Sequence, residues 1–171
     1  RAKKHEKLHS LVQLGTIAYR IAEKYRTKGL PISLSTACAS GATAIQQGME
    51  SIRRGESKAA LCVASDGLVT AEGLIRFSLL SALSTNNEKP TAASRPFSKD
   101  RNGFVMAEGS GALVLESLEH AVGRGANIIG VLRGVGEKAD FFHRTRSSPD
   151  GKPAITTIHQ AIEDAGITTA D

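Results

Sequence analysis

The sequence has no tryptophan, and its two tyrosines and five phenylalanines give an aromatic content of 4% in 171 residues. Proteins that bind single-stranded nucleic acids commonly stack the bases on aromatic side chains. The positive residues are scattered along the chain and form no arginine-rich helix. The net charge of +5 therefore does not indicate a nucleic-acid partner. A solvated surface or an acidic protein partner accounts for it.

Cysteine is also scarce, with two residues in the chain. Two cysteines do not make the disulfide framework of a small secreted domain, so the number favours a reducing compartment such as the cytoplasm. The five histidines show no metal-ligand spacing with the cysteines, so no metal site is predicted. No apolar run approaches the roughly 20 residues of a membrane span, and no signal-peptide pattern opens the sequence, so we expect no membrane insertion.

Hydrophobic periodicity predicts helices that alternate with buried strands. The helices are expected over residues 7–26, 39–54, 117–124 and 152–165. The strands are expected over residues 32–35, 59–64, 104–108, 111–116 and 127–136. Residues 84–103 have no period and are predicted to form a long loop, which in a compact domain is usually functional or disordered. This alternation indicates an α/β layered fold.

Cys38 is the first candidate for chemistry because of the residues on either side of it, PISLSTACASGATA over 31–44. A short apolar run precedes it and a small-residue helical pattern follows, which predicts a sharp turn at the start of a helix. Unpaired N–H groups and the helix dipole favour negative charge there, and the thiolate is the nucleophilic form of cysteine. A cysteine can equally be a small buried hydrophobe, and this is what we expect of Cys62, which lies inside the apolar run 59–64.

The segment STACASG at residues 35–41 resembles the nucleophile segment of the β-ketoacyl-acyl carrier protein synthases, the condensing enzymes of fatty-acid synthesis. Further blocks are similar to the same family at the expected distances. They are ALSTN at 82–86 with AASRPF at 92–97, KDRNGFV at 99–105 with EGSGALVLE at 108–116, and DFFH at 140–143. The resemblance covers the chain from Tyr25 to its end.

The resemblance implies a thiolase-like fold, in which two similar α/β halves form α-β-α-β-α layers. Residues 1–171 look like a partial ketosynthase domain, comprising most of the first half and the start of the second, with both flanks missing. The family also uses two further histidines and a glycine-rich loop, and these motifs do not occur in the sequence. We therefore expect an incomplete fold, and a fragment that does not catalyse condensation by itself.

The resemblance also implies an activity and a site. In the family the cysteine, here Cys38, takes an acyl chain from acyl carrier protein as a thioester. Malonyl-acyl carrier protein then loses carbon dioxide, and its carbanion attacks the thioester. Phe77 and Phe104 are placed near the acyl-binding region, although either can equally be a core residue. The implied partners are the acyl and malonyl forms of acyl carrier protein, the implied assembly is a homodimer, and no cofactor or metal is implied.

Several alternatives stay open from the sequence. A ketosynthase domain of a polyketide pathway would share the chemistry, but its cysteine segment usually continues Ser-Ser-Ser, against Ala39-Ser40-Gly41 here. A thiolase-like acyltransferase would share the cysteine segment but not the SRPF run at 94–97. A non-catalytic chain-length factor is expected to lack the nucleophile. Cys38 with a distant histidine would make a cysteine-hydrolase dyad, which the other blocks argue against.

Overall fold

The computed structural model describes residues 13–143 and 146–171. The chain divides into two compact units, the first formed by Arg1–Ala64 and Ala112–Val131, the second by Ser65–Gly111 and Leu132–Asp171. Of the predicted first helix, residues 7–12 lie outside the described residues. Its described part is helix α2, Leu14–Tyr25, which ends where Arg26 turns left-handed with φ of 54°.

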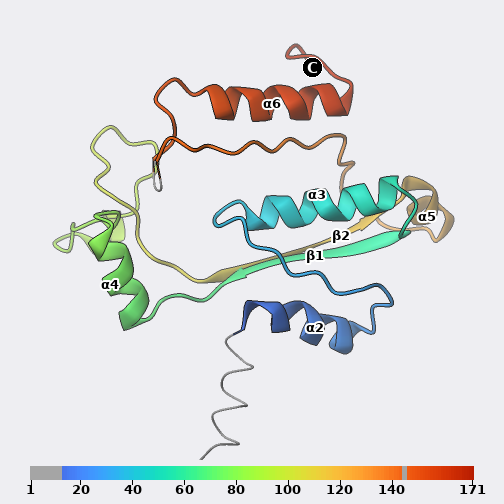
Figure 1. Ribbon diagram of the computed structural model, residues 1–171, viewed down its shortest axis with the longest axis horizontal. Helices are drawn as coiled ribbons and strands as arrows, with labels where there is room; N and C mark the ends of the chain where they lie inside the picture. Colours follow the sequence, from blue (N-terminus) through green and yellow to red (C-terminus); the bar gives the residue numbers. More distant parts are fainter. Residues whose placement is uncertain (1–12, 144–145) are drawn as a thin grey trace, which may run out of the picture. The chain divides into compact units, whose positions relative to one another are not determined.

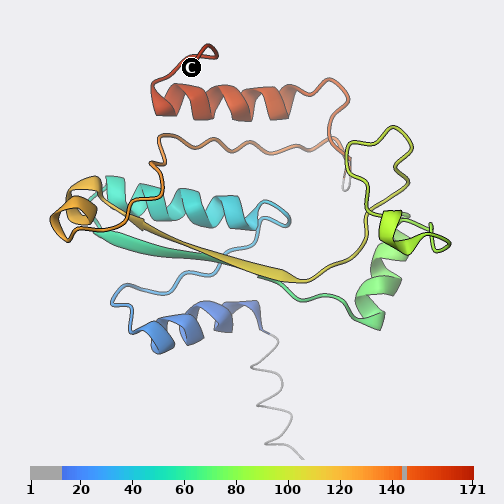
Figure 2. The ribbon, with the colours of Figure 1, turned by 180° about the vertical axis from the view of Figure 1, so that it is seen from behind.

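The first unit contains a two-stranded sheet between helices. Strand β1, Ala59–Asp66, pairs with β2, Gly109–Glu116. The N–H of Ser117, just after β2, donates to the carbonyl of Lys58, just before β1, at 3.0 Å. The end of one strand therefore lies beside the start of the other, and the pair is antiparallel. Helix α3, Ser40–Arg53, lies along one side of the strands and α2 along the other (Figures 1 and 2).

Helix α3 packs closely on the sheet because small residues face it. A Cβ atom added at Gly48 would lie 2.5 Å from Cys62 Sγ and 3.2 Å from Ala60 Cβ. At Gly41 an added Cβ would lie 3.1 Å from Ala64 Cβ. The helix thus approaches the strands along its length, and it ends before Gly55, whose positive φ is typical of a residue that terminates a helix. The short helix α5, Leu118–Gly123, follows β2, and confirms the helix expected over 117–124.

The second unit holds helix α4, Ala71–Leu79, the 3-10 turn η1, Pro90–Ala92, and helix α6, Lys152–Ala165. Helix α6 confirms the final predicted helix. Helix α4 was not predicted from the sequence, although the hydroxyl of Thr70 accepts from the Gly73 N–H at 3.1 Å and caps it. No helix in the described residues is long and apolar enough to cross a membrane.

The predicted strand over 127–136 is wrong, since these residues are extended but lie in no strand ladder. Helix α6 runs beside part of this segment instead (Figure 1). The Val135 N–H donates to the Asp164 carboxylate at 2.9 Å, and the Glu137 N–H donates to the Gln160 side chain at 3.4 Å. Side chains of α6 therefore take backbone hydrogen bonds at the end of this segment that a neighbouring strand would take. The apolar pattern is not matched by burial either, since Ile129 is 98% and Val131 63% exposed.

The expected strands over 32–35 and 104–108 are likewise extended segments without a ladder. At Phe104 there is an isolated bridge to Leu83, with the Ser84 N–H donating to the Phe104 carbonyl at 2.9 Å. A strand needs a partner over several residues, and a short apolar run cannot specify one. In the described residues the sheet consists of β1 and β2 alone.

Candidate active site

Cys38 stands on a tight turn between an extended segment and helix α3. Ala37, just before it, has a left-handed backbone with φ of 52°. The turn is closed by the Ala39 N–H, which donates to the Thr36 carbonyl at 3.2 Å, and by the Ser40 N–H, which donates to the Ala37 carbonyl at 3.1 Å. A left-handed alanine costs roughly 1–2 kcal/mol because its Cβ crowds a carbonyl oxygen. Strained turns of this kind, between an extended segment and a helix, present nucleophiles in other enzymes.

Hydrogen bonds from side-chain hydroxyl groups stabilise this turn. Ser40 Oγ donates to the Ala37 carbonyl at 2.6 Å and accepts from the Thr36 N–H at 2.9 Å. Thr36 Oγ1 lies 2.8 Å from Thr43 Oγ1, and Thr43 is buried. The residues flanking Cys38 are thereby tied to the first turns of a helix that is itself packed on the sheet.

The two cysteines differ in what can reach them. Both are free, but Cys38 is exposed whereas Cys62 is buried, at 7% exposure. Burial raises the pKa of the Cys62 thiol, which reduces its thiolate fraction at neutral pH. This confirms the expectation that Cys62 packs as a core residue. Of the two thiols, Cys38 is the one presented for chemistry.

The predicted phenylalanines lie in the second unit and contact each other. The ring centroids of Phe77, on α4, and Phe104 are 5.3 Å apart, with the ring planes at 84°, an edge-to-face pair. Cys38 belongs to the first unit. A shallow groove of about 390 Å³ also lies in the second unit, lined mostly by apolar side chains from the start of α4 and the segment after Phe104. Its lining residues are Val69, Thr70, Ala71, Leu74, Val105 and Met106.

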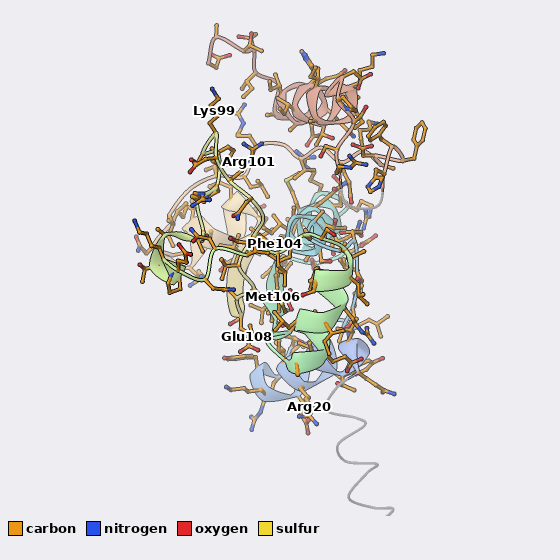
Figure 3. The ribbon with its side chains drawn as sticks, turned by 90° about the vertical axis from the view of Figure 1, so that its left-hand side faces the viewer. Arg20, Lys99, Arg101, Phe104, Met106 and Glu108 are labelled. Carbon is orange, nitrogen blue, oxygen red and sulfur yellow. The ribbon has the colours of Figure 1, made fainter. Side chains whose placement is uncertain are left out.

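Glu108 fixes the loop that leads into α4. Its carboxylate accepts from the Val69 N–H at 3.1 Å. A Cβ at Gly73 would meet the Met106 methyl group at 3.1 Å, so α4 starts close against the same segment. Figure 3 shows Phe104, Met106 and Glu108 in order along the chain beside α4. The walls of the groove are therefore joined by backbone and side-chain contacts.

Within the long predicted loop, Arg95 is an anchor. Its guanidinium donates to the Asp100 carbonyl at 2.9 and 3.1 Å and to the Ala92 carbonyl at 3.4 Å. The pKa of the Asp100 carboxyl is lowered by a hydrogen bond from Ser98 and also by the nearby positive charge of Arg95. Phe97 between them has φ of 66° and is 99% exposed. These hydrogen bonds make Arg95 an anchor of the loop.

The strongest electrostatic cluster joins the end of β2 to α5. Glu116 accepts from the Arg124 guanidinium, with one N–O distance of 2.9 Å, and lies 2.9 Å from His120 Nδ1. These hydrogen bonds, that from Arg124 first, lower the pKa of Glu116 from 4.5 to about 2. The cluster fixes the helix after the strand and has no part in the turn around Cys38.

Sequence reasoning missed Ala37, Ser40 and Glu108. A serine near a helix start is a common capping signal, and this signal in the STACASG segment would have drawn attention to Ser40. Nothing local indicates a left-handed alanine, since most residues with positive φ are glycine or asparagine. Glu108 acts on a backbone N–H that lies 39 positions earlier, which no short motif can predict.

An exposed cysteine thus lies on a sharp turn at the start of a helix packed on a sheet, as the residues around Cys38 predict. The family described as "Beta-ketoacyl synthase, N-terminal domain" matches residues 5–121. The chain belongs to this family, and the resemblance found in the sequence is confirmed.

Similar proteins agree on the family. The chain is 43% identical over 132 residues to a 3-oxoacyl-[acyl-carrier-protein] synthase 2 from Synechocystis sp., covering 77% of this chain and 32% of that protein. It is 39% identical over 155 residues to the enzyme of the same name from Rhizobium meliloti, covering 90% of this chain and 37% of the relative. The chain thus spans about a third of the length of these curated relatives.

Solved structures confirm the expected fold class. A type II polyketide ketosynthase, solved in complex with its acyl-carrier protein, superimposes with a TM-score of 0.89 at 37% identity, over 92% of this chain and 39% of that one. A β-ketoacyl synthase from Burkholderia phymatum gives a TM-score of 0.83 at 33% identity, over 90% of this chain and 37% of that one. The described structure is therefore part of a thiolase-like ketosynthase fold.

Proposed function

We propose that this chain is the nucleophile-bearing part of a β-ketoacyl-acyl carrier protein synthase that elongates fatty acids. The observation that carries the proposal is the exposed Cys38 on its strained turn, in a chain of this family. The relatives named 3-oxoacyl-[acyl-carrier-protein] synthase 2, with identities of 39–43%, support the fatty-acid pathway. The protein is thus an acyltransferase.

In the proposed reaction, Cys38 Sγ attacks the carbonyl carbon of an acyl thioester on acyl carrier protein. A new C–S bond forms to Cys38, the C–S bond to the carrier breaks, and the carrier leaves as a thiol with the proton from Cys38. Malonyl-acyl carrier protein then releases carbon dioxide, and the carbanion attacks the Cys38 thioester. Cys38 leaves as the thiolate, and the β-ketoacyl product stays on the carrier. The cysteine supplies the covalent step, so the proposal requires no cofactor.

For the acyl chain we propose contact with Phe77 and Phe104. The edge-to-face pair is only partly covered, with Phe104 44% exposed, and the apolar groove adjoins the residues after Phe104. Partly exposed aromatic and apolar surface is suited to an alkyl chain, which gains free energy by leaving water.

A second candidate function is condensation in a polyketide pathway. The structural match to a type II polyketide ketosynthase favours it. The segment after the nucleophile, Ala39-Ser40-Gly41, differs from the Ser-Ser-Ser usual in modular polyketide enzymes and favours the fatty-acid pathway. Comparing fatty acyl and polyketide intermediates as acyl donors to Cys38 separates the two.

Acyl carrier protein is the proposed partner, in its acyl and malonyl forms. A solved ketosynthase of similar structure is bound to its own acyl-carrier protein, which supports this. The net charge of +5 is suited to an acidic partner. Association should weaken with added salt, since exposed charges are screened within about 8 Å at physiological ionic strength. An affinity that is the same at low and high salt would exclude electrostatic assistance.

We also propose that the protein acts in the cytoplasm as a homodimer. Two free thiols, one of them exposed, favour a reducing compartment. Large apolar side chains are exposed in both units, with Ile129 98% and Phe141 99% exposed, and exposed apolar surface favours association with further protein surface. Analytical ultracentrifugation of the protein at several concentrations tests the dimer.

The test of the proposed function is the site of acylation. The protein is incubated with acyl-acyl carrier protein, and peptide mass spectrometry locates the added acyl mass. The adduct is expected on the peptide with Cys38, to vanish in Cys38→Ala, and to persist in Cys62→Ala. An adduct confined to Cys62 would contradict the proposal. The 171-residue chain alone is expected to form no β-ketoacyl product, because the family's further histidines and glycine-rich loop do not occur in it.

A further inference from the structure

We propose that Ser40 is a positioning residue, which holds Ala37 in its left-handed conformation and so sets the direction in which Cys38 points. The inference rests on the proposed function only for the role of Cys38. The hydrogen bonds around the turn carry the rest.

The direction in which the Ser40 hydroxyl bonds is the first observation. A serine at a helix start normally accepts a hydrogen bond from an N–H within the first helical turn. Here Ala39 occupies the N-cap position, and no side chain caps α3. Ser40 Oγ instead bonds back to the turn, donating to the Ala37 carbonyl at 2.6 Å and accepting from the Thr36 N–H at 2.9 Å. One hydroxyl thus joins the peptide group before Thr36 to the peptide group after Ala37, and spans these two residues.

The second observation is that Ser40 is itself held in place. It is the first residue of α3, and the next residue, Gly41, lies so close to the sheet that an added Cβ would be 3.1 Å from Ala64 Cβ. On the other side of the turn, Thr36 Oγ1 lies 2.8 Å from the hydroxyl of buried Thr43. The packing of α3 therefore fixes the position of Ser40, and its hydroxyl restrains Ala37, which is the strained residue of the turn.

A left-handed backbone at Ala37 decides where Cys38 lies, because the next peptide plane follows directly from the φ and ψ of Ala37. Without the hydroxyl, the alanine is free to relax toward conformations with negative φ, which suit its Cβ better. Glycine has no such preference. Replacing Ala37 with glycine should therefore make the Ser40 hydroxyl dispensable, and this is a result that a packing role for Ser40 does not predict.

The backbone conformation of Ala37 is measured by NMR in variants of the 171-residue chain. Positive φ brings the amide proton and Hα of one residue close together, so Ala37 should give a strong intraresidue NOE. We expect this NOE to persist in Ser40→Thr, which keeps the hydroxyl, and to weaken in Ser40→Ala. The matched control is Ser51→Ala in the same helix, which loses hydrogen bonds to Ser57, at 2.9 Å, and to the Glu56 carboxylate, and should leave Ala37 unchanged. An unchanged NOE in Ser40→Ala would overturn the proposal.

The effect of the Ser40 substitutions on reactivity is measured as the rate of acyl transfer to Cys38 from an acyl thioester. Ser40→Ala should slow the transfer about tenfold, equivalent to about 1.4 kcal/mol. Ser40→Thr, and the double variant Ala37→Gly with Ser40→Ala, should restore it to within about twofold of the starting rate. A double variant as slow as Ser40→Ala alone would overturn the proposal.

Folding of each variant is followed through the protection of buried Cys62 against alkylation. If Ser40→Ala exposes Cys62, the double variant must protect it again, since glycine removes the strain, and failure to do so counts against the proposal. If Cys38 of the complete protein accepts no acyl group, the proposed function is wrong. The NOE of Ala37 then still decides whether Ser40 holds the turn.

Discussion

The contact between α3 and the sheet makes a quantitative prediction at Gly48. An alanine there would place its Cβ 2.5 Å from Cys62 Sγ and 3.2 Å from Ala60 Cβ, which is too close without a shift of the sulfur or the helix. Overpacking of this kind typically costs about 1–3 kcal/mol. Alanine also gains about 1 kcal/mol over glycine in a helix interior. We therefore expect Gly48→Ala to lower the free energy of unfolding by about 1 kcal/mol.

A double-mutant cycle isolates the contact from the helix preference. In a Cys62→Ala background the nearest clashing atom is gone, so Gly48→Ala should become neutral or stabilising there. The coupling energy between the two sites should be about 1–3 kcal/mol, measured by urea unfolding followed by circular dichroism. Gly15→Ala in α2 is the matched control, because an added Cβ there meets nothing within 4 Å, and it should stabilise by up to about 1 kcal/mol. A coupling energy below about 0.5 kcal/mol would refute the packing described between α3 and β1.

Three further predictions concern charge, thiol access and the aromatic pair. The lowered pKa of Glu116, about 2 against 4.5, means that its ionised form stabilises the fold above pH 4.5. Glu116→Gln should therefore be less stable than the unaltered chain at pH 7, and urea titrations should show the difference fading as the pH falls from about 4.5 to about 2. Iodoacetamide at neutral pH should label exposed Cys38 well before Cys62, and equal labelling of the folded chain would contradict the burial of Cys62. Phe104→Ala should lower the free energy of unfolding by at least about 1 kcal/mol, whereas Phe97→Ala, at a side chain 99% exposed, should change it by less than about 0.5 kcal/mol.

The sequence predicted the helices whose signals are local. The amphipathic pattern and the arginine-arginine-glycine ending located α3 to within a residue, and Gly55 has the left-handed φ of 72° expected at a helix end. The family resemblance identified Cys38, and the structure places it on the turn at the start of α3 that the small residues indicated. These features depend on residues a few positions away in the sequence, so a local sequence pattern is enough to predict them.

Features that depend on distant partners were not predictable. Residues 127–136 are as apolar as a strand, yet the N–H groups of Val135 and of the adjoining Glu137 bond to α6 side chains 29 and 23 positions later. Helix α4 was missed because Gly73 interrupts a short helical pattern, although its missing Cβ is what allows the Leu68 carbonyl and the Met106 side chain to approach. The left-handed Ala37 was missed for a similar reason: its conformation is sustained by the hydroxyl of Ser40, not by its own preference.

The central claim is that a thioester on Cys38 is an intermediate of condensation, and a single-turnover measurement tests it most directly. The complete protein is loaded with an acyl group from acyl carrier protein, freed of excess donor, and mixed with malonyl-acyl carrier protein. Mass spectrometry then follows both the acyl adduct on the Cys38 peptide and the β-ketoacyl product on the carrier. The account predicts that adduct is lost at the rate at which product appears, and that Cys38→Ala forms neither. Product that appears while the Cys38 adduct stays intact would contradict it.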